Sequence, residues 1–207
     1  MKWNIDPVLI EIGPIAIRYY SLMFIIGFIT MGSYVKRVFV QNKYNPQLVD
    51  SLTNYIILGM LIGSRLAHCF FYDPGYYLSH PLEILMIWKG GLASHGGYIG
   101  VTIAMFLFLR KNPVIPFYKL LDIIAGPCVF VGGLIRLGNL FNSEIVGKAT
   151  DLPWAITFEK LDNIPRHPAQ VYESIAYLTL GIIAMFLIKK KFKLFHQGAI
   201  ASFVIVN

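Results

Sequence analysis

The feature that most constrains this chain is a series of apolar runs that approach or reach the length of a membrane crossing. A transmembrane helix needs about 20 predominantly apolar residues, and the runs cover residues 15–35, 52–72, 96–109, 120–140 and 171–188. Only 14% of the residues are charged, whereas about a quarter are charged in a typical soluble domain. The sequence therefore predicts an all-α polytopic membrane protein with about five full transmembrane helices.

Two further segments belong to this prediction of a single integral membrane domain over residues 1–207. An apolar stretch runs from Gly198 to Asn207, which is about half of a membrane crossing, so we expect a partial last helix. Residues 142–169 contain Pro153, Pro165 and Pro168 among scattered charges. Because such a segment suits neither a continuous helix nor the bilayer core, we expect a small extramembrane excursion, rich in strands, between the fourth and fifth spans.

The basic residues alternate from loop to loop. They follow the first, third and fifth runs: Lys36, Arg37 and Lys43; Arg110, Lys111 and Lys119; Lys189, Lys190, Lys191 and Lys193. Since cytoplasmic loops are enriched in Lys and Arg, this pattern places the N-terminus outside the cytoplasm. The net charge of +7 thus reflects orientation, and with no basic domain or nucleic-acid-binding motif we expect no nucleic-acid partner.

Polar residues inside apolar runs are costly and mark candidate functional sites. The strongest cluster extends from Arg136 to Glu144 and follows Gly132-Gly133. At helical spacing Arg136, Asn139 and Glu144 can approach one face. A guanidinium beside amide donors suits a phosphate group. The alternative is a buried Arg–Glu pair that only fixes helix register.

Three other polar positions have two interpretations each. Arg65 lies in the second run, where it binds an anion or pairs with Asp73. His95 lies between Gly90-Gly91 and Gly96-Gly97; glycines allow close packing of helices, yet they also expose backbone to a ligand, and an imidazole suits proton transfer near neutral pH. Tyr20, at the mouth of the first run, is an interfacial anchor or a ligand contact.

The run from Arg166 to Glu173 opens the fifth span. Pro168 suits the start of a helix, and Gln170, Tyr172 and Glu173 then enter the membrane with that helix. Helix capping explains part of this run only.

Taken together, these runs resemble the prolipoprotein diacylglyceryl transferases of bacteria, and the resemblance covers almost the whole chain in order. The matching segments are Asp6-Pro7, Gly13-Pro14, Arg18 to Met23, Gly63-Ser64-Arg65, Phe71-Tyr72, Gly90 to Gly97, Gly133 to Glu144, and Arg166 to Glu173. The resemblance implies a multi-pass enzyme of the bacterial inner membrane. Such enzymes transfer the diacylglyceryl group of phosphatidylglycerol to the lipobox cysteine thiol of prolipoproteins, the first step of lipoprotein maturation, and release glycerol phosphate.

The resemblance also implies which residues line the site. We hypothesise that His95 takes the thiol proton and that Arg136 holds the lipid phosphate, with Asn139 and Asn142 donating to its oxygens. Glu144 would orient Arg136 or the headgroup, and the remaining substrate-binding candidates are Tyr20, Arg65 and His167. No metal or cofactor is expected, because the nucleophile comes from the substrate. The family has a further arginine and glutamate in a final span, which would continue past Asn207.

A membrane transporter or channel for an anionic solute is the alternative function. Arg65, Arg136 and the glycine-rich helices are compatible with it, but the chain lacks the repeated halves that many transporters have.

Overall fold

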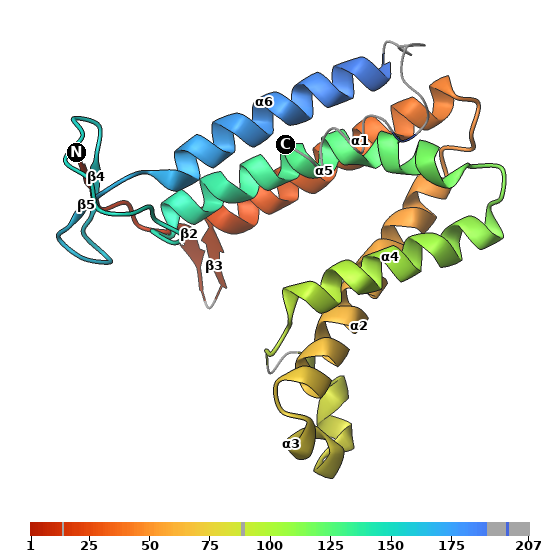
Figure 1. Ribbon diagram of the computed structural model, residues 1–207, viewed down its shortest axis with the longest axis horizontal. Coiled ribbons are helices and arrows are strands. Elements are labelled where there is room, and N and C mark those ends of the chain that lie inside the picture. Colours follow the sequence, from red (N-terminus) through yellow and green to blue (C-terminus); the bar gives the residue numbers. More distant parts are fainter. Residues whose placement is uncertain (14, 88–89, 190–197, 199–207) are drawn as a thin grey trace. The chain divides into compact units, whose positions relative to one another are not determined.

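The computed structural model describes residues 1–13, 15–87, 90–189 and 198 (Figure 1). The chain forms two compact units: the first unit comprises Met1–Val38 and Tyr118–Asn207, and the second unit comprises Phe39–Phe117. The described helices are α1 (Tyr19–Gln41), α2 (Leu48–Phe71), α3 (Pro74–Ser79), η1 (Pro81–Leu85, a 3-10 helix), α4 (Ser94–Lys111), α5 (Phe117–Phe141) and α6 (Ala169–Lys189). Within the described residues, four helices are long and apolar enough to cross a membrane: α1, α2, α5 and α6.

All five predicted spans contain a helix, but their boundaries differ from the prediction. The first begins at Tyr19 rather than at residue 15, because Ile15–Arg18 is a strand that pairs with Val8–Ile12. The third, α4, has polar residues at both ends and is not among the four helices that meet the length and hydropathy of a span. The predicted partial helix after Gly198 lies outside the described residues.

In the first unit, helices α1, α5 and α6 lie side by side (Figure 1). Glycines bring α5 and α6 close together: a Cβ added at Gly133 would lie 2.8 Å from Leu178 Cγ, and one at Gly181 would lie 2.7 Å from the backbone nitrogen of Phe130. Small residues at such crossings let helix backbones approach in a membrane. The Tyr34 hydroxyl also ties α1 to α6 by donating to the carbonyl of Met185 at 2.8 Å.

A three-stranded sheet covers one end of these helices, and two of its strands lie within residues 142–169, the segment that was predicted to be rich in strands. Its strands are β1 (Lys2–Trp3), β4 (Ile156–Phe158) and β5 (Pro165–Arg166), with β1 parallel and β5 antiparallel to β4. The sheet shares a hydrophobic core with the end of α5 and the start of α6, made of Leu140, Ile156 and Phe158 with Trp3, Val146 and Val171 packed against it. The end of α5 is therefore fixed from outside the helices.

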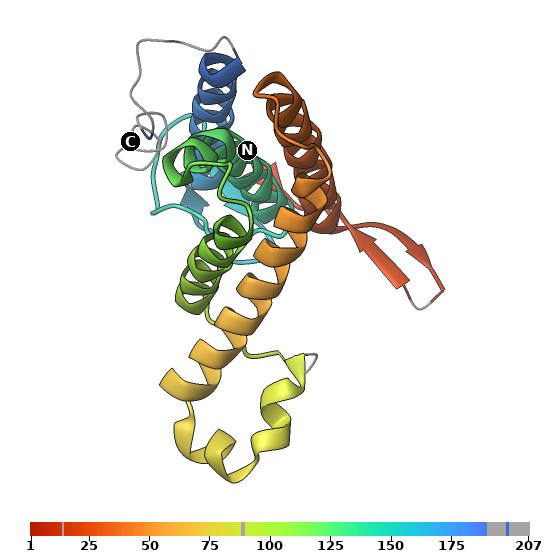
Figure 2. The same cartoon turned by 90° about the vertical axis from the view of Figure 1, so that its right-hand side faces the viewer.

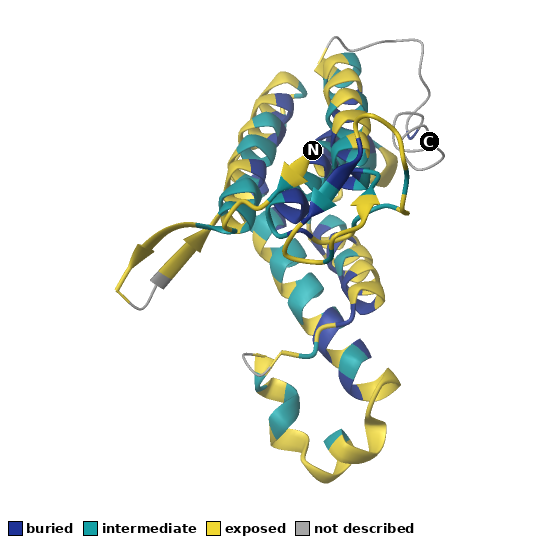
Figure 3. Ribbon diagram, turned by 90° about the vertical axis from the view of Figure 1, so that its left-hand side faces the viewer, coloured by how far each residue is buried: buried dark blue, intermediate teal, exposed yellow. Residues whose placement is uncertain are grey.

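A hairpin of β2 (Val8–Ile12) and β3 (Ile15–Arg18) precedes α1. Most of its residues are exposed (Figure 3), including the aliphatic side chains of Leu9, Ile10, Ile12 and Ile17. Exposed aliphatic side chains in a group are typical of surfaces that meet lipid or another protein.

In the second unit, α2 and α4 pack against each other through glycines (Figure 2). A Cβ added at Gly63 would overlap the carbonyl oxygen of Gly96 and lie 2.8 Å from the Cα of Gly100. An apolar groove of about 670 Å³ runs along this pair and is lined by residues such as Leu66, Phe70 and Ile103. The close packing of two glycine-bearing helices therefore defines this unit.

We expect Gly63→Ala to destabilise the second unit by about 1–3 kcal/mol, because the added methyl group meets backbone atoms that cannot move aside. Gly32→Ala in α1 is the matched control, since a Cβ there has nothing within 4 Å and alanine favours helix. Thermal unfolding in detergent measures both variants. Equal midpoints for the two would contradict the packing.

Candidate active site

The strongest predicted cluster lies at the end of α5 in the first unit. Arg136 Nε is 2.5 Å from Glu173 Oε2 of α6, and the two side chains retain 27% and 37% of their exposure. Within the described residues, Arg136 has this ion pair but donates no well-formed hydrogen bond to another protein group. The guanidinium is therefore held by charge while its N–H donors stay available to a ligand. The expected partner of Arg136 was Glu144, and the structure replaces it with Glu173.

Glu144 is instead bound by the two asparagines of the same run. Asn139 Nδ2 donates to Glu144 Oε2 at 3.1 Å, and Asn142 Nδ2 donates to Glu144 Oε1 at 3.3 Å. Because an ionised carboxylate only accepts hydrogen bonds, each asparagine turns its NH₂ group, and not its carbonyl oxygen, toward Glu144. The predicted approach of Asn139 and Glu144 is thus present, but these amide groups point to Glu144 rather than standing free for a phosphate.

The turn that carries Glu144 has an unusual backbone. Ser143 (φ 56°) and Ile145 (φ 54°) are both in the left-handed region, which is a genuine outlier for a β-branched residue such as Ile145. Gln170 of α6 is fully buried, and its Nε2 donates to the carbonyl oxygen of Glu144 at 2.5 Å. The turn is therefore strained on both sides of Glu144 and is held between them by α6.

Tyr20 lies next to this run, where α1 crosses α5. A Cβ added at Gly138 would be 2.7 Å from Tyr20 Cδ2 and 3.2 Å from its Cα. The neighbouring ring of Tyr19 stacks on Phe141, with ring centroids 4.3 Å apart. Only glycine at position 138 lets Tyr20 lie between the levels of Arg136 and Asn139 on α5.

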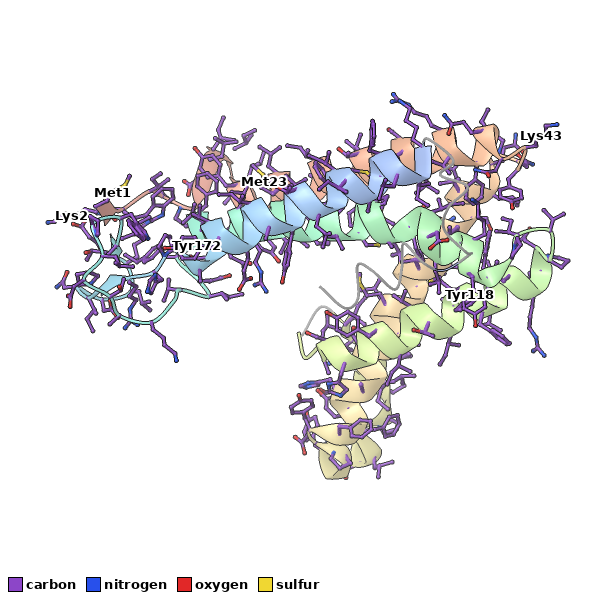
Figure 4. All side chains as sticks on the ribbon, turned by 45° about the horizontal axis from the view of Figure 1, so that its top comes forward. Met1, Lys2, Met23, Lys43, Tyr118 and Tyr172 are labelled. Carbon is purple, nitrogen blue, oxygen red and sulfur yellow. The ribbon has the colours of Figure 1, made fainter. Side chains whose placement is uncertain are left out.

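His167 lies between the end of β5 and the start of α6. Its Nδ1 is 3.3 Å from the hydroxyl of Tyr172, which in turn accepts a hydrogen bond from Trp154 Nε1 at 2.8 Å. Figure 4 places Tyr172 at this end of α6, close to Met1 and Lys2. Since the tyrosine hydroxyl accepts from Trp154, its own proton can go to His167 Nδ1, which leaves Nε2 as the donor of that ring.

The strand β5 is held by an ion pair that lies outside the four helices long and apolar enough to cross a membrane. Arg166 Nη2 lies 2.6 Å from Asp162 Oδ2, and Arg166 Nη1 also donates to the carbonyl of Gly147 at 3.4 Å. The hydrogen bond from Arg166 lowers the pKa of Asp162, helped by the backbone N–H of Ile164, and the same bond raises the pKa of Arg166. Asp162 is therefore stabilised in its charged form in the folded state.

We expect Asp162→Asn to lower the thermal stability of the sheet at neutral pH and to have no such effect at strongly acid pH. A carboxyl group whose pKa is lowered on folding stabilises the fold above its unfolded pKa, and this contribution is lost as pH falls through the folded pKa. Fluorescence melting monitors the change through Trp154. Asp151→Asn, an exposed carboxylate in the same segment, is the control, and a pH-independent effect of Asp162→Asn would refute the explanation.

In the second unit, Arg65 is buried and donates its hydrogen bonds to backbone carbonyls. It donates from Nε to the carbonyl of Ile84 (3.0 Å), from Nη1 to those of Gly90 (2.6 Å) and Gly91 (3.2 Å), and from Nη2 to that of Glu83 (2.5 Å). Within the described residues these carbonyls and the ring of Tyr77, 5.0 Å away, are its partners, so the expected pair with Asp73 does not form. Arg65 has few donors left for an anion, in contrast to Arg136.

Gly91 is required for this arrangement. Its φ of +75° is in the left-handed region, and an added Cβ would lie 2.5 Å from His68 Nε2 and 2.9 Å from Arg65 Nη1. Of the two roles predicted for the glycines near His95, Gly91 therefore has the packing role. Its bare backbone lies against side chains of α2, because Arg65 fills the space beside it.

His95 itself lies in the first turn of α4 and is exposed. Its ring is near two aromatic side chains from the end of α2, with centroids 5.7 Å from Phe71 and 6.0 Å from Tyr72. Among the described residues, no group makes a hydrogen bond to its ring nitrogens. The imidazole is therefore oriented by aromatic contacts and keeps both nitrogens available for proton transfer.

The structure thus brings together Tyr20, Arg136, Asn139, Asn142 and Glu144 in the first unit, with His167 beyond the start of α6, and it places Arg65 and His95 in the second unit. Two residues beside the first cluster were absent from the predicted site, Gln170 and Glu173. Both are polar residues that the sequence places in the membrane at the start of the fifth span. Their cost in a bilayer was the signal that could have placed them at the site.

Comparison with known proteins identifies the family of this chain. The family model described as prolipoprotein diacylglyceryl transferase matches residues 7–207. The phosphatidylglycerol–prolipoprotein diacylglyceryl transferase of Tolumonas auensis is 45% identical over 187 residues, which are 90% of this chain and 72% of that protein. The enzymes of the same name from Chloroherpeton thalassium (46% identity, 86% of this chain and 66% of that protein) and Bacteroides fragilis (42%, 96% and 76%) are similar too. The chain therefore belongs to the prolipoprotein diacylglyceryl transferase family.

Proposed function

We propose that this protein transfers the diacylglyceryl group of phosphatidylglycerol to the lipobox cysteine thiol of prolipoproteins. The observation that carries the proposal is Arg136, a guanidinium near the end of a membrane helix whose two terminal nitrogens have no protein acceptor among the described residues. Such a group is suited to hold the phosphate that leaves in this reaction. Arg65, whose donors are taken by four carbonyls, has a structural role in this proposal.

The chemistry has two requirements. The cysteine thiol loses its proton, and its sulfur then attacks the glycerol carbon that carries the phosphate ester. A C–S bond forms, the C–O bond breaks, and its electron pair leaves with glycerol phosphate. His95 is proposed to take the thiol proton, because thiolate and not thiol is the nucleophile. Arg136 stabilises the negative charge that develops on the departing phosphate.

The remaining candidate residues have supporting roles in this proposal. Asn139 and Asn142 hold the Glu144 carboxylate by one N–H each, so the second N–H of each amide group is left for the substrate. Glu144, which is exposed, accepts hydroxyl donors from the glycerol headgroup. Tyr20 and His167 are proposed to contact the headgroup from α1 and from the start of α6.

We also propose the arrangement in the membrane. The chain forms one integral membrane domain with five spans, in which α4 crosses with α1, α2, α5 and α6, and a partial last span. The basic loops place the N-terminus outside the cytoplasm, and residues 142–169 then lie on the outer side. The bacterial inner membrane supplies the lipid substrate.

The experiment is a transfer assay with the full chain in lipid vesicles. A lipobox peptide is expected to gain the mass of a diacylglyceryl group when the vesicles contain phosphatidylglycerol and not when they contain phosphatidylethanolamine alone. A peptide with serine in place of its cysteine is the control and should stay unmodified. Passage of an anionic solute across the vesicles without peptide modification would instead favour the transporter.

A further inference from the structure

Helix α6 contacts the Arg136–Glu144 run at two levels and the preceding turn of α5 at a third. Ser174 Oγ donates to the carbonyl of Gly133 at 2.9 Å and is buried. The carboxylate of Glu173 pairs with Arg136, and Gln170 Nε2 holds the carbonyl of Glu144. Glu173 and Ser174 lie three and four positions after Gln170 on α6, so the three residues share roughly one helix face. One rigid element therefore contacts both ends of the run and the turn before it.

The register of these contacts is set by packing. Gly126 and Gly133 of α5 and Gly181 of α6 lie where an added Cβ would be within 3 Å of backbone atoms of the opposite helix. Bringing two helices this close leaves no room for a shift of one turn, because every side chain would meet a different level. The positions of Gln170 and Glu173 relative to α5 are thus fixed before any substrate arrives.

The contact between Glu173 and Arg136 has a particular form. It joins Nε to Oε2 but leaves Glu173 Oε2 without a well-aligned hydrogen bond. The carboxylate therefore holds the guanidinium by charge at its inner nitrogen, while the two terminal nitrogens remain as a fork for a second anion. In contrast, a full bidentate pair would have used the same donors that a phosphate needs.

Gln170 acts on the other end of the run. Ser143 and Ile145 both have positive φ, and such strain persists only when neighbouring structure holds it. The Gln170 amide supplies one of these constraints, since it is fully buried and its donor reaches the carbonyl between the two strained residues. Its loss would let the turn relax and move the Glu144 side chain.

From these contacts we infer that Glu173 and Gln170 are positioning residues of the transfer reaction. Glu173 aims the Arg136 guanidinium at the departing phosphate, and Gln170 holds the strained turn that presents Glu144. The inference rests on the proposed function for its kinetic consequences, whereas the two contacts can be tested without any reaction.

The first experiment measures Glu173→Gln in the vesicle assay. Since the charge of Arg136 remains, KM for phosphatidylglycerol should stay within about threefold, whereas kcat should fall about 10- to 100-fold because the guanidinium is no longer aimed. Glu173→Asp should recover part of the loss. Glu159→Gln, which removes a carboxylate from the surface pair with Lys2, is the control and should stay within about twofold of the unmodified protein.

A double variant shows whether Glu173 acts through Arg136. In an Arg136→Lys background, Glu173→Gln should lower kcat by less than about twofold more, because the group that it aims is already gone. The inference is overturned if Glu173→Gln retains full kcat, or if it lowers kcat by the same factor in both backgrounds.

Two measurements do not depend on activity. In protein with ¹⁵N-labelled arginine, the Arg136 Nε–H signal should be shifted and protected from exchange, and Glu173→Gln should abolish both; an unchanged signal would refute the aiming role. Gln170→Met should speed tryptic cleavage after Lys148, which is exposed three residues beyond Ile145, and equal rates would refute the turn-holding role. If the unmodified protein transfers no lipid, the proposed function fails while these two readouts still decide the inference.

Discussion

Replacing Arg136 with lysine is expected to lower kcat/KM for lipid transfer roughly 100- to 1,000-fold, nearly as much as replacing it with alanine, because a fixed donor to the developing phosphate charge is lost. Lysine keeps the charge but is a point donor without the planar fork. In addition, Glu173 holds Arg136 at Nε, and a lysine ammonium would pair with that carboxylate directly. The proposed phosphate contact would then be exchanged for an ion pair within the protein.

The measurement is steady-state transfer to a lipobox peptide from vesicles that contain phosphatidylglycerol. Arg110→Lys is the matched control, because Arg110 lies in the last turn of α4 over the ring of Phe106 and has no proposed part in the reaction. Arg65→Lys provides a second comparison: we expect it to reduce folded protein, since four carbonyls lose their donors. An Arg136→Lys variant with full activity would exclude the phosphate role.

The second large effect is expected from His95→Gln, which should lower kcat about 100- to 10,000-fold at neutral pH, the usual range for loss of a general base. Glutamine keeps a polar group of similar size at the start of α4 but cannot take a proton. A cysteine thiol has a pKa of about 8.5, so at higher pH the substrate ionises without help. The loss should therefore shrink as the assay is moved from about pH 7 to about pH 9.5.

His80→Gln is the control for this experiment, because His80 caps α3 and its Nδ1 lies 3.1 Å from the carbonyl of Tyr76. The two variants should share the same folded yield and thermal midpoint. A His95→Gln loss that is the same at every pH would point to a role in binding or packing against Phe71 and Tyr72 instead of proton transfer.

Much of the helical framework could be predicted because the length of an apolar run is a local property of the sequence. The spans that became α5 and α6 were placed within three residues of their observed ends, since apolar runs of this size have few other folds. The hairpin before α1 was missed for the same reason: Ile15, Ala16 and Ile17 are as apolar as the helix that follows. Only pairing with Val8–Ile12 makes them a strand.

In the candidate site, too, contacts within one segment could be predicted, whereas contacts between distant segments could not. The contact of Asn139 with Glu144 could be predicted, because it depends on spacing within one segment. The partner of Arg136 could not, since Glu173 is 37 positions away along the chain and the helix-to-helix register depends on the glycines between α5 and α6. Likewise, the hydrogen bonds from Arg65 to backbone carbonyls depend on the path of the segment after α2. The pattern of side chains in a sequence gives little information about such a backbone path.

The ion pair between α5 and α6 also bears on how the protein enters the bilayer. A lone arginine or glutamate within a membrane helix raises the free energy of its insertion by about 2.5–3.5 kcal/mol near the centre, and by less toward the ends. Arg136 and Glu173 face each other across two successive helices, so the pair carries no net charge when both helices enter together. Synthesis of α5 therefore leaves a charge that only α6 neutralises, and the two helices are expected to leave the translocation machinery as a hairpin rather than one after the other.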